Sequence, residues 1–530
     1  MTSLLHLDLG YNQIVGPLTK SFGNLCSLKT LSLAFNNLTG HLPQIFSYLS
    51  GCSKPTLETL LLNDNFLSGS LPDFTLFSSL RELQVQRNKL NGSFPKSFRH
   101  LSHLTILYLD SNNLVGSIPD LTVFVSLKEL SVYDNLLNGN LPKSLGKLSK
   151  LEDLDVSSNF LKGTITEDHM SNLSSLTHLD LSSTFSTLNF KDSWVPPFQL
   201  ETIFMRDFKV GPSFPKWLQT QHTFSILDIS NATISDTIPN WFWDLSPNLY
   251  ILNISHNHMR GVLPDLTLKF AENPVIDLSY NDFEGTIPPV PPKVTSLILS
   301  KNNFSGSMSF LCGITGENLF YLDLSDNQLS GSLPNCSIHW QNLTILNLAN
   351  NNLSGKIPNS VDSGCTIQSL HLSNNNLVGE LPSSLKHCTQ MRVIDVGNNK
   401  FSGKIPTWIG DSMSDLVVLS LRSNQFHGML PIPLCYMSQL QVLDLSFNNI
   451  TGAIPKCLAN LTSMSHKQSS DDANATKIMY PFIAATTKIK MSSLVMEDIH
   501  CHIGSIARSN DHRDLLTDWK HSMFSLALYH

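Results

Sequence analysis

A phrase of about 24 residues recurs along almost the whole chain, and this repeat constrains the fold more than any other feature. One copy reads DLSDNQLSGSLP, from Asp323 to Pro334. Aligned on its asparagine, the template LxxLxLxxNxLxGx(L/I)P fits 16 times, and three weaker copies keep the spacing, which makes 19 copies. The intervals run from 21 to 29 residues, and ten of the 18 intervals are 24. A period this regular predicts an array of similar structural units.

The template position is occupied by asparagine in most copies and by another residue in the three weaker ones. The asparagines are Asn12, Asn36, Asn65, Asn88, Asn112, Asn135, Asn159, Asn257, Asn281, Asn302, Asn327, Asn351, Asn375, Asn399, Asn424 and Asn448, and the other residues are Thr184, Phe208 and Ala232.

Each part of the repeat has a physical role. The alternation in LxxLxL predicts a short strand with its leucines facing inward, and strands of successive copies stack about 4.8 Å apart in a parallel sheet. The asparagine side chain can bond backbone groups that the following turn leaves unpaired, so successive asparagines are expected to form a buried ladder. The later glycine suits a positive φ. Because one copy cannot bury its leucines alone, the sequence predicts an α/β repeat solenoid.

The extension LxGx(I/L)P occurs as LSGSLP, as LSGKIP (353–358) and as FSGKIP (401–406). This pattern resembles the plant-specific subclass of leucine-rich repeats, and the resemblance covers about residues 4–461. It implies a curved, right-handed superhelix with a parallel concave β-sheet and a second short sheet formed by the extension. We therefore expect a solenoid of about 19 repeats over residues 1–461, followed by a poorly ordered non-repeat tail over residues 462–530.

The three weaker copies form an irregular, aromatic-rich region at about residues 176–246. They also lack the template glycine, which is replaced by Leu188, Pro212 and Asp236. Four of the seven tryptophans fall in this region: Trp194, Trp217, Trp241 and Trp243. Two interpretations remain open, because the aromatic residues either fill the core of irregular coils or form a binding surface.

The phrases WVPPFQL, FPKWLQTQ and IPNWFWDLS in this region resemble plant receptor-like proteins related to the receptors for fungal ethylene-inducing xylanase. The resemblance implies a ligand-binding ectodomain at the extracellular face of the plasma membrane, active in defence or developmental signalling. It further implies that the ectodomain recognises a peptide, protein or glycan and acts through a partner receptor kinase. The alternatives are a soluble extracellular repeat protein that inhibits a microbial wall-degrading enzyme, or a nonfunctional receptor fragment.

Both ends of the sequence depart from the plan of this receptor group. The chain opens inside a repeat, with neither a signal peptide nor the cysteine-paired cap of the family. It contains no stretch of 18 uncharged apolar residues, so membrane attachment is expected only through a segment missing from this chain.

Composition and motifs argue against nucleic-acid binding and catalysis. Charged residues make up 15% of the chain and the formal net charge is -7, whereas a nucleic-acid binder needs a basic stripe. Phosphate-binding, metalloprotease, serine-hydrolase and kinase signatures are missing from the sequence. His256 and His258 flank Asn257 without a third ligand nearby, which favours a structural role. We expect neither an enzyme nor a cofactor.

Twelve N-x-[ST] sequons suit a glycosylated, secreted ectodomain. Some arise as a by-product of NNLSG or NNLTG, but the sequons at 172, 335, 342 and 460 lie outside that motif. The candidate asparagines are Asn37, Asn91, Asn172, Asn231, Asn253, Asn303, Asn335, Asn342, Asn352, Asn449, Asn460 and Asn474.

Eight of the nine cysteines fall into pairs that lie one repeat apart. The pairs are Cys26 and Cys52, Cys312 and Cys336, Cys365 and Cys388, and Cys435 and Cys457, which leaves Cys501 over. Equivalent positions on stacked coils lie near the Cα separation of roughly 4.4–6.8 Å that a disulfide needs. We hypothesise that at least two pairs form disulfides on the convex side, in an oxidising compartment. The alternative is buried free thiols in a leucine-like role.

The candidate ligand-binding residues occupy the outward positions of the predicted concave sheet, because side chains alternate across a strand. Copies four to six and the weak copy at 200–208 combine aromatic residues, arginine and carboxylates there, a mixture that protein-binding surfaces favour. The alternative is a solvated face without a partner. The candidates are Glu82, Gln84, Gln86, Arg87, Tyr108, Asp110, Tyr133, Asp134, Phe204, Arg206 and Asp207.

Overall fold

The computed structural model describes residues 3–51, 56–245, 248–315, 318–336, 342–359 and 364–461. The chain divides into two compact units, residues 1–463 and 464–530, and every described element belongs to the first. The non-repeat tail lies outside the described residues, so its poor order stays a prediction.

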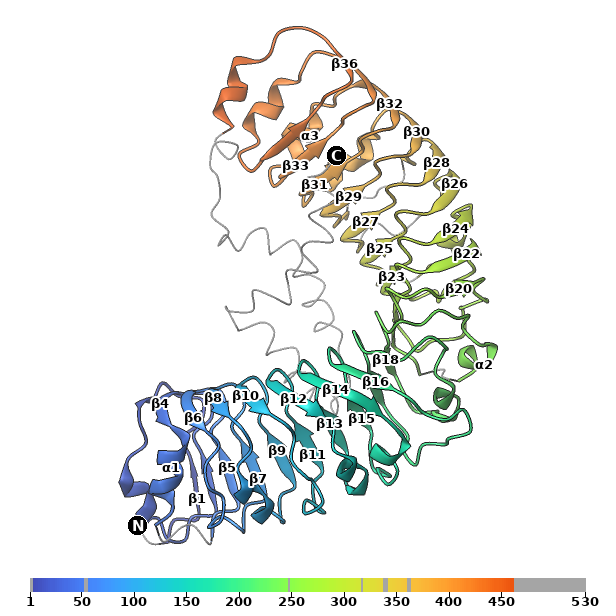
Figure 1. Cartoon of the computed structure of the whole chain (residues 1–530). Helices are drawn as coiled ribbons and strands as arrows, with labels where there is room; N and C mark the ends of the chain where they lie inside the picture. The colour runs from blue at the N-terminus through green and yellow to red at the C-terminus, as the bar shows by residue number, and fades with distance from the viewer. Residues whose placement is uncertain are drawn as a thin grey trace. The chain divides into compact units, whose positions relative to one another are not determined.

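A parallel sheet of 19 strands, one from each copy of the repeat, lines the inner side of a curved array (Figure 1). Each strand pairs with the strand of the next coil, where a coil is one copy of the repeat; Leu31, for example, is the partner of both Leu7 and Leu60. The strands are β1 (His6–Asp8), β3 (Thr30–Ser32), β5 (Thr59–Leu61), β7 (Glu82–Gln84), β9 (Ile106–Tyr108), β11 (Glu129–Ser131), β13 (Asp153–Asp155), β15 (His178–Asp180), β17 (Thr202–Phe204), β18 (Ile226–Asp228), β19 (Ile251–Asn253), β21 (Val275–Asp277), β23 (Ser296–Ile298), β25 (Tyr321–Asp323), β27 (Ile345–Asn347), β29 (Ser369–His371), β31 (Val393–Asp395), β33 (Val418–Ser420) and β35 (Val442–Asp444). The weak copies contribute strands as well, since their inward positions remain apolar.

The plant-type extension forms the expected second sheet, but in two parts of eight and nine strands. The first part holds β2 (Val15–Gly16), β4 (Asn37–His41), β6 (Phe66–Ser70), β8 (Lys89–Gly92), β10 (Asn113–Gly116), β12 (Leu136–Asn140), β14 (Phe160–Ile165) and β16 (Phe185–Leu188). The second part holds β20 (Arg260–Gly261), β22 (Asp282–Thr286), β24 (Asn303–Gly306), β26 (Gln328–Ser332), β28 (Asn352–Gly355), β30 (Asn376–Gly379), β32 (Lys400–Lys404), β34 (Gln425–Gly428) and β36 (Asn449–Ile450). The gap between the two parts lies between β16 and β20, and a single bridge borders it on each side: Thr187–Lys209 and Thr237–Arg260. The two coils in the gap are those where Pro212 and Asp236 replace the template glycine.

Short helices occur in many of the returns from a second-sheet strand to the next main strand, whereas others, such as the return from β6 to β7, are irregular. The α-helices are α1 (Leu42–Leu49), α2 (Asn240–Trp243) and α3 (Trp408–Ser412). The 3-10 helices are η1 (Lys20–Asn24), η2 (Lys96–His100), η3 (Lys143–Lys147), η4 (Glu167–His169), η5 (Lys216–Thr220), η6 (Ser309–Gly313), η7 (Ser383–His387), η8 (Ile432–Tyr436) and η9 (Lys456–Asn460). The inward leucines of strands and returns form one continuous buried core.

The predicted asparagine ladder is present between these layers. Asn65 shows its geometry: Nδ2 donates to the Leu33 carbonyl of the preceding coil at 2.9 Å and to the Leu62 and Asn63 carbonyls of its own coil at 3.2 and 3.1 Å. Its Oδ1 accepts the backbone N–H of Leu38 at 2.9 Å. One buried side chain therefore pairs four backbone groups, two in each of two adjacent coils.

The ladder is broken across the three weak copies. Thr184 donates to Leu181 within its own coil at 3.1 Å, while Phe208 and Ala232 are buried apolar side chains at 1% and 0% exposure. Asn257 restarts the ladder, because its Oδ1 accepts the N–H groups of both Ala232 and Ile234.

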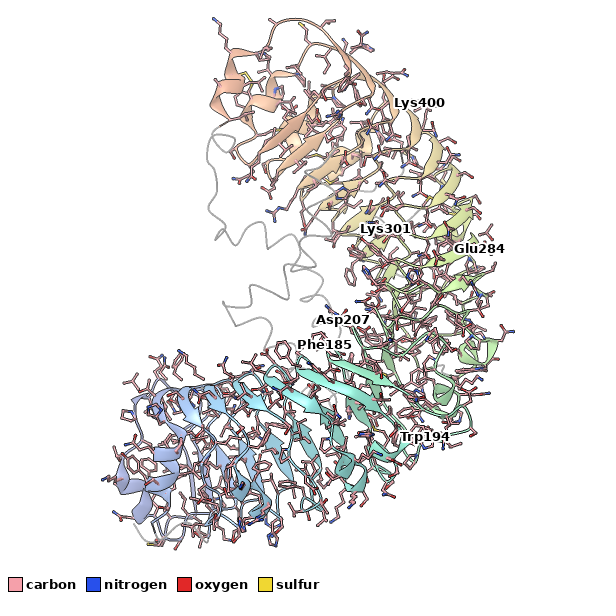
Figure 2. The ribbon with its side chains drawn as sticks, viewed as in Figure 1. Phe185, Trp194, Asp207, Glu284, Lys301 and Lys400 are labelled. Carbon is pink, nitrogen blue, oxygen red and sulfur yellow. A yellow bond between two sulfur atoms is a disulfide. The ribbon has the colours of Figure 1, made fainter. Side chains whose placement is uncertain are left out.

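Aromatic packing replaces the ladder in this region. Trp217 and Trp243 are 5% and 7% exposed. The ring of Trp194, which Figure 2 labels, lies 4.4 Å from the ring of Phe190. These contacts belong to the continuous core. Of the two interpretations of the aromatic residues, the structure supports core packing.

The residue before each template position adopts a left-handed backbone in all 19 copies, with φ from 48° to 56°. The predicted positive φ of the template glycine is also present, as at Gly139 (φ 78°), where a Cβ would lie 3.3 Å from that of Ser117. The left-handed residue before the template position was not predicted from the sequence. Tyrosine, arginine and serine occur there alongside Asn and Asp, the residues that favour this conformation.

Three of the candidate cysteine pairs are joined as disulfides in the structure: Cys312–Cys336, Cys365–Cys388 and Cys435–Cys457, with Cα separations of 5.6, 4.7 and 5.4 Å. Cys312, Cys435 and Cys457 lie in return helices, on the side of the coil away from the main sheet. Cys52, the candidate partner of Cys26, lies outside the described residues, as does Cys501.

We expect Asn135→Ala to destabilise the solenoid by roughly 2–4 kcal/mol, because leaving buried backbone groups unpaired costs about 1–3 kcal/mol each before relaxation. Asn135 is 5% exposed and pairs with Leu109, Leu114, Val132 and Tyr133. Urea unfolding of the secreted chain measures the change. The exposed Asn138→Ala on β12 is the control, and an equal shift for both variants would contradict the role of the ladder.

Non-reducing peptide mapping of the secreted chain should recover the three disulfides as linked peptides. We expect reduction to lower the unfolding midpoint, since each bond closes a loop of 22 to 24 residues and such closures contribute about 3 kcal/mol. Free thiols at all six positions would favour the alternative of buried cysteines.

Candidate ligand-binding face

All eleven candidate residues lie on the outward face of the main sheet or at the corner, which is the turn that follows each main-sheet strand. They form two groups. The first group lies on three adjacent coils, where Gln84 on β7 is the partner of Tyr108 on β9, which is the partner of Ser131 on β11. Phe204, with Arg206 and Asp207, belongs to β17 and its corner, separated from the first group by β13 and β15. The candidates therefore form a cluster and an outlier rather than one patch.

Polar side chains of the first group hold one another in place. Gln84 Nε2 donates to Glu82 at 2.7 Å, and the Tyr108 hydroxyl donates to the Glu129 carboxylate. Arg87 lies 3.6 Å from Asp64. Burial raises the pKa of Glu82. These side chains are half-buried, so the cluster is a pre-ordered surface with its orientations largely set before a ligand arrives.

Asp110 is the most perturbed carboxyl of this cluster. It is 5% exposed, and burial raises its pKa to about 7, with a further increase from the nearby Asp155 carboxylate. Ser131 and Arg87 oppose the increase by stabilising the charge. Gln86, the neighbouring outward residue on the preceding coil, is also buried.

A row of buried aspartates lies on the same face and was not predicted from the sequence. Asp155 accepts the backbone N–H and the hydroxyl of Ser157 at 2.9 and 2.6 Å, and the same Asp-x-Ser contact recurs in later coils. Burial raises the pKa of Asp277 to about 6 and also raises those of Asp228 and Asp323. The sequence pattern that could have predicted these buried aspartates is Asp-x-Ser at the end of a main-sheet strand.

The sheet face from β13 to β25 is acidic as a result. Its outward strand and corner positions hold the acids Asp153, Asp155, Asp180, Asp207, Asp228, Asp277, Asp323 and Asp326 and the bases Arg206 and Lys301.

Corner residues form contacts along the rim of the sheet. Asp207 (labelled in Figure 2) lies 3.2 Å from Arg206 and accepts Asn231 Nδ2 at 2.7 Å. The His256 ring stacks on Tyr280 at 4.0 Å, and Lys301 lies over Tyr280 at 4.5 Å. These contacts give His256 a packing role.

His258 lies 3.6 Å from Asp282, away from the main sheet. In the described part of the chain, no group of three His, Cys, Asp or Glu side chains is arranged to hold a metal ion.

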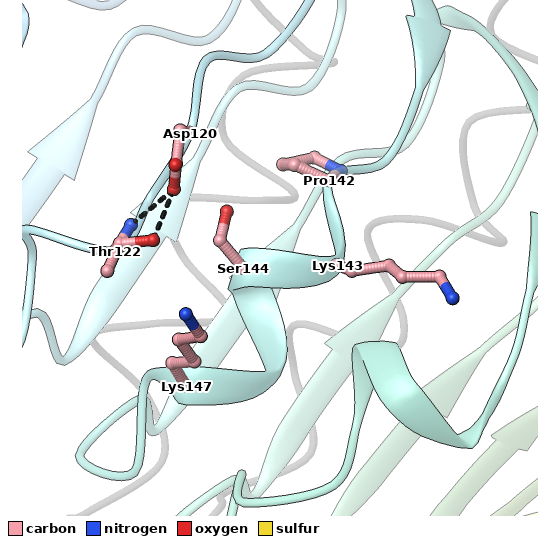
Figure 3. Close-up of a pocket in the computed structure, with 6 residues that line it drawn as sticks. All are labelled: Asp120, Thr122, Pro142, Lys143, Ser144 and Lys147. Atoms are coloured by element: carbon pink, nitrogen blue, oxygen red, sulfur yellow. Dashed lines mark hydrogen bonds between the residues drawn. The ribbon is translucent and has the colours of Figure 1, made fainter.

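A shallow, open depression lies on the return side of the solenoid, lined by Asp120, Thr122, Pro142, Lys143, Ser144 and Lys147 (Figure 3). Asp120 accepts the backbone N–H and hydroxyl of Thr122, which lowers its pKa, and Lys143 lies 2.7 Å from Asp168. Asp120 and Lys143 are already paired and the depression is open to solvent, so it resembles surface relief more than an enclosed small-molecule site.

Nine of the candidate glycosylation sites are exposed: Asn37, Asn91, Asn172, Asn231, Asn303, Asn335, Asn342, Asn352 and Asn449. Asn253 is half-buried on the main sheet, where Nδ2 donates to Asp228 at 3.2 Å and Oδ1 accepts Ser255. This arrangement makes Asn253 the least accessible of the ten. The Asn460 side chain and Asn474 lie outside the described residues. Glycosylation stays a prediction.

Among the residues that the structure describes, none of the helices is long and apolar enough to cross a bilayer.

Two leucine-rich-repeat profiles match the sequence. A leucine-rich repeat region profile matches residues 69–260, and a leucine rich repeat profile matches residues 3–25, 27–49, 318–339, 342–363, 366–388, 390–412 and 439–461. The chain belongs to the leucine-rich-repeat family. Within that family it is similar to plant receptor-like proteins, which confirms the resemblance inferred from the sequence.

Two receptor-like proteins of Solanum lycopersicum are the relatives that show this grouping. The chain is 48% identical to receptor-like protein EIX2 over 383 residues, covering 63% of this chain and 37% of the relative. It is 48% identical to receptor-like protein EIX1 over 342 residues, covering 55% and 33%. The chain thus spans about a third of the length of these relatives.

Solved plant receptor structures share the fold. The plant peptide hormone receptor RGFR1, in complex with RGF2, aligns with a TM-score of 0.68 and 27% identity, covering 88% of this chain and 81% of that one. The Arabidopsis receptor kinase HAESA, in complex with the peptide hormone IDA and the co-receptor SERK1, aligns with a TM-score of 0.65 and 27% identity, covering 87% and 85%. The predicted curved leucine-rich-repeat solenoid is confirmed.

The raised pKa of Asp110 predicts a pH-dependent stability that Asp110→Asn removes. The folded residue keeps its proton up to about pH 7, whereas the unfolded residue loses it near pH 4, so folding becomes less favourable as pH rises through this window. We expect the variant to be more stable than the wild type at about pH 8, by on the order of a few kcal/mol, and the gap to shrink towards about pH 4.

Urea unfolding midpoints across this pH range test the prediction. The exposed carboxylate variant Asp415→Asn is the control and should follow the wild-type curve. A constant difference between Asp110→Asn and the wild type at every pH would show that Asp110 is ionised in the folded chain.

Proposed function

We propose that this chain is the ligand-binding part of a plant cell-surface receptor, with the outward face of the main sheet as the ligand-contact surface. The observation that carries the proposal is the pre-ordered cluster on β7, β9 and β11, where aromatic, amide, guanidinium and carboxylate groups share one continuous sheet face. Such a broad surface suits a peptide, a protein or a glycan better than a small molecule.

The solved neighbours support a peptide or protein ligand. The RGFR1 and HAESA structures hold peptide hormones, and the HAESA complex also holds a co-receptor. Because a co-receptor is part of the HAESA complex, signalling through a partner receptor kinase is part of the proposal. The excess of carboxylates from β13 to β25 favours a ligand with basic groups, through electrostatic steering.

A fungal ethylene-inducing xylanase is the first probe, because the chain resembles that receptor group. We expect it to bind the secreted chain, more weakly at higher salt, without loss of xylanase activity. Binding accompanied by inhibition would favour the alternative of a wall-degrading-enzyme inhibitor. Absence of binding to the xylanase would exclude this ligand and leave peptide libraries as the next probe.

Two arginines at the same repeat position provide a matched pair of variants. Arg206 and Arg422 both lie two residues before the template position, and each lies near a carboxylate, Asp207 or Asp444. We expect Arg206→Ala to weaken binding about tenfold, the effect of losing one contact of about 1.4 kcal/mol, and Arg422→Ala to change it less than about twofold. Calorimetric titration measures both. Equal effects would exclude Arg206 from the ligand-contact surface.

A further inference from the structure

Four large apolar side chains stand exposed in a row on the first part of the second sheet. Val115 on β10, Leu136 on β12, Phe160 on β14 and Phe185 on β16 are 40%, 43%, 48% and 65% exposed. Val115 is the backbone partner of Leu136, and the rings of Phe160 and Phe185 are stacked 6.0 Å apart. We call this row the apolar stripe; Figure 2 labels Phe185 at its end. A run of exposed apolar side chains on neighbouring strands of a folded domain indicates a contact site.

The strands that carry the apolar stripe hold basic residues and no acidic ones. Strands β8, β10, β12, β14 and β16 contain no acidic residue, and Lys162 on β14 is the backbone partner of Phe185. Lys209 continues the row through its bridge to Thr187. Among the described residues, neither Lys162 nor Lys209 has a carboxylate partner. The stripe thus combines apolar surface with unneutralised cations, the opposite of the acidic main sheet.

The distribution of sequons leaves the same stretch uncovered. On this sheet, sequons begin at Asn37 and Asn91 before the apolar stripe and at Asn303, Asn352 and Asn449 after it. Strands β10 to β16 contain none. Asn91 on β8 is the backbone partner of Asn113, so a glycan there would flank the Val115 end of the stripe, whereas the strands of Leu136, Phe160 and Phe185 hold no sequon.

We propose that the apolar stripe is a docking surface for a second protein, which presents apolar side chains flanked by carboxylates. Charge complementarity selects this partner, since carboxylates would neutralise Lys162 and Lys209 while apolar side chains cover Phe160 and Phe185. A second copy of this chain would place lysine against lysine in a symmetric pairing, so self-association is disfavoured. Because the stripe lies on the second sheet, the main sheet stays available to a ligand while the partner is docked.

The test uses the secreted chain and a synthetic fluorescent peptide that alternates phenylalanine with glutamate, compared with a peptide in which lysine replaces glutamate. We expect the glutamate peptide to bind, more weakly with added salt, and the lysine peptide to bind at least tenfold more weakly. The double variant Phe160→Ser/Phe185→Ser should weaken binding of the glutamate peptide about tenfold, and Lys162→Glu should do the same. Val262→Ser removes another exposed apolar side chain, 66% exposed, beside β20, and should leave binding unchanged.

A glycan placed on the apolar stripe gives a second readout, and a matched variant separates the effect of the glycan from the loss of the Val115 side chain. Val115→Ser converts Asn113-Leu114-Val115 into a sequon on β10, and Asn113→Gln/Val115→Ser keeps the substitution without the sequon. We expect the glycosylated variant to lose peptide binding and the double variant to retain it, with glycosylation verified by intact mass.

Three results would overturn the proposal. The first is equal binding of the glutamate and lysine peptides, or binding of neither. The second is undiminished binding by the glycosylated variant. The third is dimerisation of the wild type, seen by sedimentation and abolished by the added glycan, which would make a second copy of the chain the occupant.

Discussion

The buried asparagine ladder is the interaction on which the rest of the solenoid depends. Each side chain pairs backbone groups of its own coil and of the preceding one, so it satisfies the turn and sets the stacking of coils at the same time. A strand of three residues has few hydrogen bonds of its own. The ladder and the continuous leucine core together make each short strand stable in its place.

The three coils without the asparagine show what happens when this constraint is relaxed. The main sheet continues through them, because Leu179, Ile203 and Leu227 remain paired and buried, but the second sheet is interrupted. Aromatic rings such as Phe214 and Phe242, 5.3 Å apart, supply the packing there. The main sheet thus needs only the apolar strand positions, whereas the second sheet is lost in the two coils where Pro212 and Asp236 replace the glycine and persists as β16 in the coil where Leu188 does.

Two neighbouring surfaces of the solenoid have different chemistry. The main sheet collects carboxylates, several of them buried enough for their pKa values to rise, and presents pre-ordered polar groups. The second sheet from β10 to β16 is apolar and basic. In the receptor that we propose, this division allows one surface to bind a ligand and the other to hold a partner protein without competition between them.

The sequence by itself determined the solenoid, because the leucine period and the asparagine specify strand, turn and stacking locally, and 16 of the 19 coils from Asn12 to Asn448 keep both while the other three keep the apolar strand positions. It also indicated which positions face outward, and the spacing of Cys365 and Cys388 already indicated a contact between adjacent coils. Only the tertiary structure decided how buried those outward positions are, since Asp110 and Asp155 are covered by side chains of neighbouring coils. It likewise separated Arg206 from the cluster around Tyr108 and aligned Phe160 with Phe185. These properties depend on the register between coils, which residues about 24 positions apart in sequence acquire only when the coils stack.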